Sequence, residues 1–175
     1  MQIFAATTLT MFCSLAAFIA MHPRSDGESA KAELLGADGK AIGTLTLSQD
    51  AGGVHISGRL SGLPPGPHAL HIHATGQCHG PDFAGAGPHF NPYQKKHGLK
   101  SKDGPHAGDL PNFTAAADGS VDIECVAPLV TLRTGKNSLF QPGGTCLVIH
   151  EKPDDDVSDP AGNAGNRLAC GVILK

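Results

Sequence analysis

The chain has 175 residues, of which 40% are hydrophobic, and a formal net charge of −3. The length predicts one domain with chain to spare at one end, and the hydrophobic share is enough for a packed core. The 23 glycines and 13 prolines argue against a helical bundle, because helix interiors tolerate neither residue well. The small acidic excess argues against a nucleic-acid-binding protein, which would need clustered lysines and arginines.

The first 21 residues carry no charged side chain and are mostly Ala, Leu, Thr, Phe and Ile. They predict a secretory signal peptide, although no Lys or Arg precedes the apolar run and the small-residue cleavage site is poor. The stretch is also long enough to cross a bilayer, so an uncleaved N-terminal anchor in a membrane is an open alternative. Residues 22–30 follow as a short linker, and residues 31–175 are predicted to form the folded domain.

From residue 31 onward, short apolar segments alternate with turns rich in Gly, Asp and Ser. Residues 41–47 alternate apolar and polar side chains, which is typical of a half-buried strand. We expect strands over residues 32–35, 41–47, 54–60, 68–73, 112–116, 120–125, 129–132, 146–150 and 169–174. Such a series, without a convincing long helical period, predicts an all-β fold, an antiparallel sandwich or barrel.

Two long segments, residues 74–110 and 151–167, interrupt the series of strands. The first contains four prolines, and the second contains four aspartates. Structured loops of this length inside a compact domain are usually functional, so we expect the functional site here.

Seven of the ten histidines lie between His68 and His106, a crowding that folding alone does not explain. His71 and His73 occupy positions i and i+2 of a predicted strand, so their side chains share one face, about 7 Å apart along the chain. By itself such a pair is weak evidence for a metal, because hydrogen-bonded histidines also occur on strand faces. Further candidate ligands follow: His89, His97, His106, Asp109 and His150. Six histidines and one aspartate exceed the needs of one four-coordinate ion, so the sequence predicts two ions, and imidazole suits zinc and copper.

The segments around these residues resemble the copper/zinc superoxide dismutase family. In chain order they are residues 71–73, 87–92, 96–98, 104–110, 150–155 and 162–171, and the similarity extends over residues 31–175. The resemblance implies a Greek-key β-sandwich of immunoglobulin-like architecture. It also implies an oxidoreductase that converts superoxide to oxygen and hydrogen peroxide by Cu(II)/Cu(I) cycling, in antioxidant defence outside the cytoplasm. The loop lengths look most like those of exported bacterial members, which are periplasmic or extracellular.

The resemblance also implies a role for each site residue. Copper would be bound by His71, His73, His89 and His150. Zinc, with a structural role, would be bound by His89, His97, His106 and Asp109. His89 would thus bridge the two metals, and it would also transfer a proton during catalysis. Asp154 would link a copper ligand to a zinc ligand, and Arg167 would attract and orient the superoxide anion.

Beyond the first 21 residues the chain has four cysteines: Cys78, Cys125, Cys146 and Cys170. In an oxidising compartment four cysteines allow three sets of pairings, and their spacing does not choose among them. The resemblance implies a disulfide between Cys78 and Cys170. It assigns no partner to Cys125 or Cys146, which could be buried free thiols or a second bridge.

Two other functions compete with a dismutase. A non-catalytic copper/zinc-binding or copper-delivery module could use the same fold, but such relatives usually lack some copper ligands or the arginine, and this chain has them all. A sandwich that binds zinc only for stability would leave the copper histidines and Arg167 unexplained.

The acidic segment 155–160 lacks the family's guiding lysine, so attraction of superoxide would depend on Arg167 and Lys152. The sequence leaves open whether the chain forms a homodimer.

Overall fold

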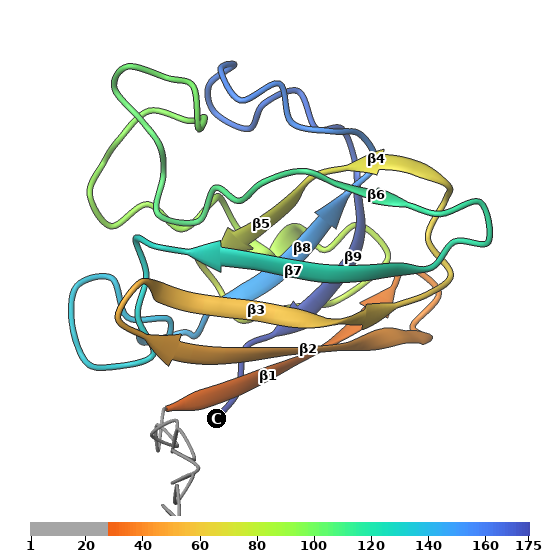
Figure 1. Cartoon of the computed structure of the whole chain (residues 1–175), viewed down its shortest axis with the longest axis horizontal. Coiled ribbons are helices and arrows are strands. Elements are labelled where there is room, and N and C mark those ends of the chain that lie inside the picture. The colour runs from red at the N-terminus through yellow and green to blue at the C-terminus, as the bar shows by residue number, and fades with distance from the viewer. Residues whose placement is uncertain (1–27) are drawn as a thin grey trace, which may run out of the picture.

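The structure is a computed structural model, and it describes residues 28–175 (Figure 1). The predicted signal peptide or anchor, residues 1–21, lies outside the described residues, as does most of the predicted linker. The first strand begins at Ser29, close to the predicted start of the domain. Within the described part of the chain, no helix is long and apolar enough to cross a membrane.

Residues 28–175 form nine strands and one short 3-10 helix. The strands are β1 (Ser29–Gly36), β2 (Ala41–Asp50), β3 (Gly53–Leu60), β4 (Gly66–His68), β5 (Leu70–His73), β6 (Phe113–Ala115), β7 (Val121–Ala127), β8 (Cys146–His150) and β9 (Arg167–Val172), and the helix is η1 (Ala84–Ala86). All pairs of these strands are antiparallel. The all-β fold class predicted from the sequence is therefore confirmed.

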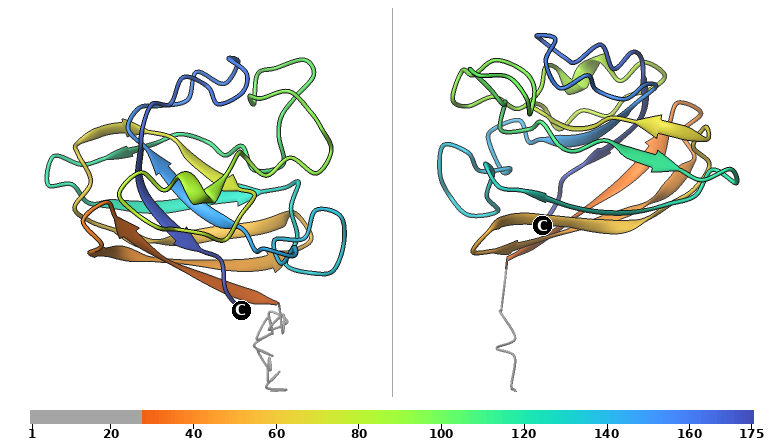
Figure 2. Two further views of the ribbon diagram at one scale, coloured as in Figure 1. Left: turned by 180° about the vertical axis from the view of Figure 1, so that it is seen from behind. Right: turned by 45° about the horizontal axis from the view of Figure 1, so that its top comes forward.

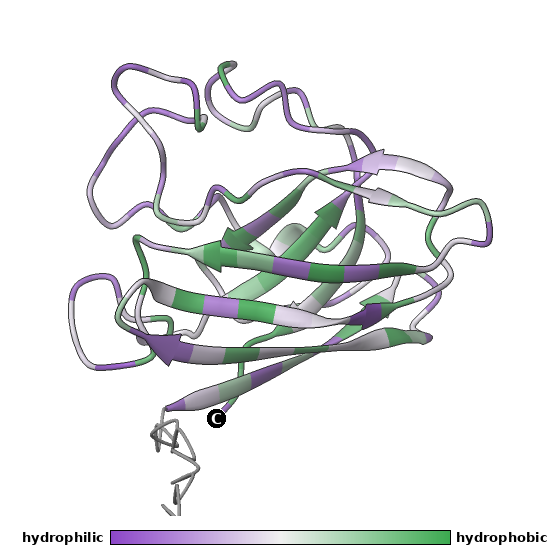
Figure 3. Cartoon of the chain, in the orientation of Figure 1, coloured by the Kyte–Doolittle hydropathy of each residue, from purple (hydrophilic) through white to green (hydrophobic). Residues whose placement is uncertain are grey.

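Seven strands form one sheet in the order β5-β8-β9-β1-β2-β3-β7, and β4 pairs with β6 in a small second sheet. The alternation predicted for residues 41–47 is present in β2, where Leu45 and Leu47 are buried and Thr44 and Thr46 are exposed. Figure 3 shows this alternation of hydrophobic and hydrophilic residues along the strands. Apolar side chains from β1, β2 and β3 share one core with those of β5 and β8, so the sheet curls around them.

Two expected strands differ in the structure. Residues 129–132 form no strand, because the backbone there has other partners. The Thr131 amide donates to the Asn137 carbonyl oxygen (3.0 Å), and the Leu132 amide donates to Oε1 of Gln49 (2.8 Å). Residues 68–73 divide into two strands at Ala69, whose amide donates to the second long loop instead of to a strand neighbour. This break brings the start of that loop next to β5.

The outer face of β8 and β9 is covered by residues 74–90, which include η1 (Figure 2). A second apolar cluster forms there from Phe83, Ala86, Cys146, Val148 and Cys170. A disulfide between Cys78 and Cys170 fixes this segment to β9, with a Cα–Cα distance of 5.4 Å. The other long loops, residues 91–112 and 151–166, lie side by side at one end of the sheet and are joined by ion pairs (Figures 1 and 2).

Candidate metal centre

Strands β5 and β8 are neighbours, and both present histidines on the face opposite to the core. In β5, Leu70 and Ile72 belong to the core, so His71 and His73 project from the other face. Strand β8 alternates in the same way and presents His150 on that face. The two histidines of one strand and the single histidine of the next are thereby brought together.

The first long loop runs along the free edge of β5 and adds two further side chains. The Phe90 amide donates to the carbonyl oxygen of Ile72 (2.8 Å), and the Ile72 amide donates to that of Gly108 (2.9 Å). These bonds place His89 and Asp109 beside β5, each in an isolated β-bridge with it. Position 108 requires glycine, because a Cβ atom there would lie 2.3 Å from the Ile72 carbonyl oxygen.

Four histidines converge in a first group: His71, His73, His89 and His150. Each ring offers one nitrogen, and these nitrogens all lie within 4.8 Å of one another. The Nε2 atoms of His73 and His150 are 3.3 Å apart. Nδ1 of His73 donates to the Gly87 carbonyl (2.8 Å), and Nδ1 of His150 donates to the Gly165 carbonyl (3.4 Å). A neutral ring that donates through Nδ1 has its lone pair on Nε2, so both rings are oriented as ligands.

Burial keeps the rings of this first group neutral. It lowers the pKa of His73 to about 2, and it lowers the pKa values of His89 and His150 to about 4. Burial also lowers the pKa of His71, against the opposing effect of its hydrogen bond to Asp154. Neutral imidazole is the form that binds a metal ion, so these rings need lose no proton at neutral pH to do so.

A second group surrounds the carboxylate of Asp109. Its Oδ1 atom lies 2.9 Å from Nδ1 of His89 and 3.1 Å from Nδ1 of His97. Nδ1 of His106 is 3.3 Å from the same oxygen. Burial alone would raise the pKa of Asp109, but the three imidazoles around its carboxylate hold it well below its ordinary value. Three imidazoles and one anionic oxygen are a ligand set that suits tetrahedral zinc.

Asp154 joins the two groups. Its Oδ2 atom accepts from Nε2 of His71 (2.6 Å), and its Oδ1 atom accepts from Nε2 of His97 (3.0 Å). Asn112 holds Asp154 by two 2.8 Å hydrogen bonds with its backbone. Gly162 passes so close that a Cβ atom there would lie 1.8 Å from Oδ1 of Asp154. The rings of His71 and His97 are therefore fixed with Nδ1 turned away from Asp154, toward the first and the second group respectively.

Three buried ring nitrogens have no hydrogen-bond partner within residues 28–175: Nδ1 of His71, Nε2 of His89 and Nδ1 of His106. A buried polar atom without a partner is costly, and a bound cation would satisfy each of these three. His89 belongs to both groups, with Nδ1 directed at the second group and Nε2 left over for the first. The arrangement therefore fits two metal ions that share the ring of His89.

Arg167 lies beside the first group, because it is the partner of His150 in the register of β8 with β9. Its guanidinium donates to the carbonyl oxygens of Phe83 (2.5 Å) and Gly87 (2.6 Å). The Gly87 carbonyl also accepts from His73, so Arg167 and this histidine of the first group share one acceptor. Arg167 also lines a cavity of about 430 Å³. A permanently charged, half-buried guanidinium at such a cavity suits a small anion.

Comparison with known proteins identifies the family of this chain. Residues 41–173 match the family described as copper/zinc superoxide dismutase. A copper-zinc superoxide dismutase of Aquifex aeolicus is 53% identical over 146 residues, which cover 82% of this chain and 85% of that protein. The chain belongs to the copper/zinc superoxide dismutase family. Both the recognised family and the β-sandwich fold expected from it are thus confirmed, and the two histidine groups suit copper and zinc.

Further members of the family are bacterial too. A copper-zinc superoxide dismutase of Caulobacter vibrioides is 43% identical over 83% of this chain and 85% of that protein. The crystal structure of a superoxide dismutase-like protein from Bacillus subtilis has a TM-score of 0.79 at 39% identity, covering 82% of this chain and 97% of that one. The copper/zinc superoxide dismutase from Brucella abortus has a TM-score of 0.68 at 30% identity, covering 83% of this chain and 99% of that one.

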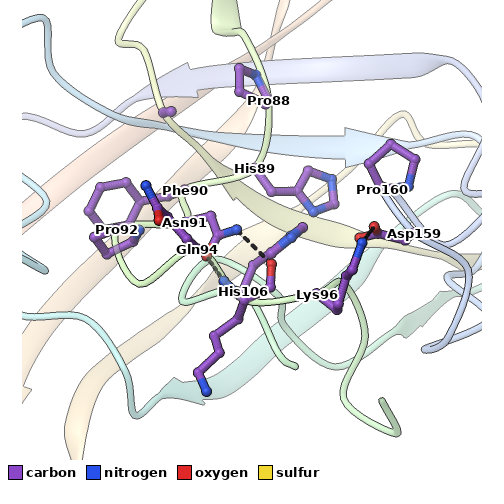
Figure 4. A pocket seen from close by; sticks show the side chains of 12 residues that line it. Pro88, His89, Phe90, Asn91, Pro92, Gln94, Lys96, His106, Asp159 and Pro160 are labelled. Carbon is purple, nitrogen blue, oxygen red and sulfur yellow. Dashed lines mark hydrogen bonds and ion pairs between the residues drawn. The ribbon is translucent and has the colours of Figure 1, made fainter. Parts of the chain in front are cut away.

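A larger cavity, of about 640 Å³, lies on the side of the second histidine group in this family member. His89 and His106 line it together with Lys96 and Asp159, as Figure 4 shows. The last two side chains form a 2.9 Å ion pair that is exposed to solvent, so the pair adds little stability. Arg167 lines the smaller cavity instead, and Pro88 lines both cavities.

The cysteines and the remaining histidines lie outside the two histidine groups. Cys78 and Cys170 form the disulfide that the family resemblance implies, whereas Cys125 and Cys146 are free thiols. His68 belongs to neither histidine group, and its ring nitrogens lie 2.8 Å from the carbonyl oxygens of His150 and Pro64. His79 is exposed and His55 is partly exposed, while His22 lies outside the described residues.

Asn112 belongs to the centre, although no pattern in the sequence identifies it. It stands at the start of a segment expected to be a strand, and no spacing or motif distinguishes it. Its role becomes visible only when the chain brings it to Asp154, 42 positions later.

Proposed function

We propose that this protein is a superoxide dismutase in which His71, His73, His89 and His150 bind copper, and His89, His97, His106 and Asp109 bind zinc. The observation that carries the proposal is the complete ligand set next to Arg167, whose guanidinium is held by two carbonyl oxygens. The relatives named as copper-zinc superoxide dismutases support it, since they align with at least 81% of the chain.

The residues of the centre divide the work of the reaction. Copper, when bound, supplies the one-electron acceptor and donor, whereas zinc has no redox chemistry of its own. Arg167 binds the superoxide anion, because its charge is permanent and its remaining N–H groups can donate to a small anion. Asp154 holds His71 and His97 in the tautomers that present Nδ1 to the metals.

His89 is the residue we assign to proton transfer. Nδ1 of its ring stays engaged with the second group, while Nε2 has no other hydrogen-bond partner among the described residues. A ring anchored at one nitrogen can take up a proton at the other without leaving its place. His89 can therefore hold a proton at Nε2 and donate it to the second superoxide as that anion is reduced.

We also propose that the protein is exported to the periplasm or the extracellular space, with residues 1–21 as its signal peptide. The disulfide between Cys78 and Cys170 supports export, since disulfides persist mainly in oxidising compartments. Mass spectrometry of the protein recovered from its producing cells tests the proposal. A mature chain that lacks the signal peptide is expected, and a full-length chain in the membrane fraction would favour the retained anchor.

The decisive experiment combines metal analysis with a superoxide dismutation assay on the purified, metal-loaded chain. We expect one copper, one zinc and high activity. His150→Ala removes a ligand that belongs to the copper group alone, so activity should fall to that of the copper-free protein while zinc content stays near normal. Equal loss of both metals would show that the division into two groups is wrong.

A non-catalytic copper-binding or copper-delivery module is the second candidate. One bacterial relative is named only as superoxide dismutase-like, so membership of the family does not by itself establish catalysis. Full copper and zinc occupancy without dismutation would favour this candidate. The intact set of copper histidines and Arg167 is the reason that we place it second.

A further inference from the structure

Three cysteine sulfurs that belong to neither histidine group meet on the outer side of the sheet. Cys146 comes from β8, Cys170 from β9, and Cys78 from the covering segment. Their Sγ atoms all lie within 4.8 Å of one another, although 92 positions separate Cys78 from Cys170 along the chain. The disulfide joins only two of these sulfurs, so the free thiol of Cys146 lies beside a bond in which it takes no part.

The surroundings of this cysteine cluster (Cys78, Cys146 and Cys170) are apolar on one side and open on the other. Cys146 and Cys170 are fully buried, and they pack with Phe83 and Val148. Cys78 is only partly buried, and it lines a cavity of about 640 Å³ together with Cys170. The exposed His79 lines the same cavity, so a small ion can approach Cys78 from solvent past an imidazole.

Burial makes Cys146 a poor nucleophile. It raises the pKa of this thiol to about 12, against a smaller opposing effect of the nearby Arg167 charge. Thiolate, not thiol, attacks a disulfide, so Cys146 leaves the bond between Cys78 and Cys170 undisturbed at neutral pH. A bound cation changes this balance, since a coordinating thiol is deprotonated outright.

We propose that the reduced protein binds one Cu(I) ion through the cysteine cluster of Cys78, Cys146 and Cys170. A dithiol reductant first gives two electrons and two protons to the disulfide and becomes a disulfide itself. The three thiols then bind Cu(I), form three Cu–S bonds and release three protons to solvent. The ion keeps its oxidation state throughout.

The chemistry of the cluster selects Cu(I) over the other metal of this family. Thiolates are soft ligands that suit both Cu(I) and zinc, so the number of ligands has to distinguish the two ions. Structural zinc sites have four protein ligands, whereas this cluster has three sulfurs.

The disulfide and the Cu(I) site exclude each other, because both use the sulfurs of Cys78 and Cys170. When the thiols of Cys78 and Cys170 are oxidised back to the disulfide by the disulfide form of the dithiol, the Cu(I) ion would be released. It would be released beside the centre that we propose to use copper. The cluster does not depend on that proposed function, since none of its residues belongs to either histidine group.

The test titrates Cu(I) into the zinc-loaded full-length protein under anaerobic conditions, against a competing Cu(I) chelator. The disulfide form and the reduced form are compared. We expect the reduced form to bind one more ion, with sulfur ligands visible by X-ray absorption spectroscopy. Cu(I) should also protect the cluster from alkylation by iodoacetamide, measured peptide by peptide, while Cys125 on β7 stays reactive.

Two variants sharpen this test. Cys146→Ala should lower the affinity for the additional ion at least tenfold, whereas Cys125→Ala should leave it unchanged. If Cys146→Ala fails to fold, the comparison of the two redox forms of the unmodified protein still decides. The proposal is overturned if the reduced form binds no more Cu(I) than the disulfide form, or if Cys78, the partly exposed member of the cluster, is alkylated equally fast with and without Cu(I). Neither result depends on dismutase activity.

Discussion

Two regions of the molecule are stabilised in different ways. One is the half of the sheet formed by β1, β2, β3 and β7, and the other is the metal-binding side, which holds the two histidine groups. In the first, side chains such as Leu34, Leu47 and Ile56 are fully buried among other apolar groups. Each of them needs only to be apolar and of about the right size. On the metal-binding side the buried groups are imidazoles and carboxylates, held at distances such as the 2.6 Å between His71 and Asp154. There, the positions of single nitrogen and oxygen atoms decide whether each buried polar group has a partner.

Charge explains why the metal-binding side depends on cations. Asp109 and Asp154 have side chains exposed by only 1% and 2%, and two buried carboxylates without partners would be costly. Burial disfavours the charged form of His97, but hydrogen bonds with both carboxylates outweigh it and raise its pKa to about 10. In the metal-free protein, a protonated His97 thus supplies part of the positive charge that metal ions supply in the loaded protein. The sheet core needs no such compensation.

The largest expected effect on stability comes from the sheet core. Ile56→Ala in the metal-free protein should lower the free energy of unfolding by about 2–5 kcal/mol, because it leaves a cavity among packed leucines. Affinities for copper and zinc, measured where the variant is folded, should stay unchanged. His55→Ala is the control: it lies on the opposite face of β3 with 41% of its side chain exposed, and we expect a small effect. A loss of metal affinity in Ile56→Ala would contradict the separation of the two regions.

Reduction of the disulfide should destabilise the metal-binding side and leave the sheet core unaffected. The loss expected from the chain-entropy argument is about 2–4 kcal/mol, since the bond closes a long loop. Hydrogen exchange should accelerate over residues 74–91 and leave β1, β2 and β3 protected. Uniform acceleration across the chain would mean that the covering segment and the sheet unfold as one unit.

Removing the charge of Asp154 should weaken both metal sites together. Asp154→Asn keeps the shape of the side chain but cannot accept from two imidazoles at once, so we expect affinity for each metal to fall by about 10–100-fold. Competition with metal chelators measures this. Asp155→Asn is the matched control, because Asp155 is exposed and contacts neither group. An effect confined to one metal would contradict the role of Asp154 as a link.

The smallest expected effect concerns the rate alone. Arg167→Glu should lower the dismutation rate about tenfold, because it replaces attraction of the anion by repulsion, and it should leave metal content intact. Arg167→Lys should lose less, since it keeps the charge but not the planar set of donors. The rate of the unmodified protein should fall with added salt, and that of Arg167→Glu should respond less. Equal rates in all three proteins would reduce Arg167 to a structural residue.

Much of both regions could be predicted from local patterns. The alternation over residues 41–47 predicts β2, and the spacing of His71 and His73 places both rings on one face, because side chains in a strand repeat every two residues. Prediction was wrong for residues 129–132, whose apolar pattern suits a strand. The Leu132 amide there donates to the side chain of Gln49, a contact that no local pattern contains.

By itself, the sequence determined the all-β fold, the copper/zinc superoxide dismutase family and the candidate ligands, because period, residue type and motif order are local properties of the chain. Only the tertiary structure decided which atoms meet. It brought Asn112 to the backbone of Asp154, and it placed Cys146 against the disulfide between Cys78 and Cys170. These contacts join residues far apart in the chain, and they arise where curling of the sheet and packing of loops on its outer face bring separate segments together.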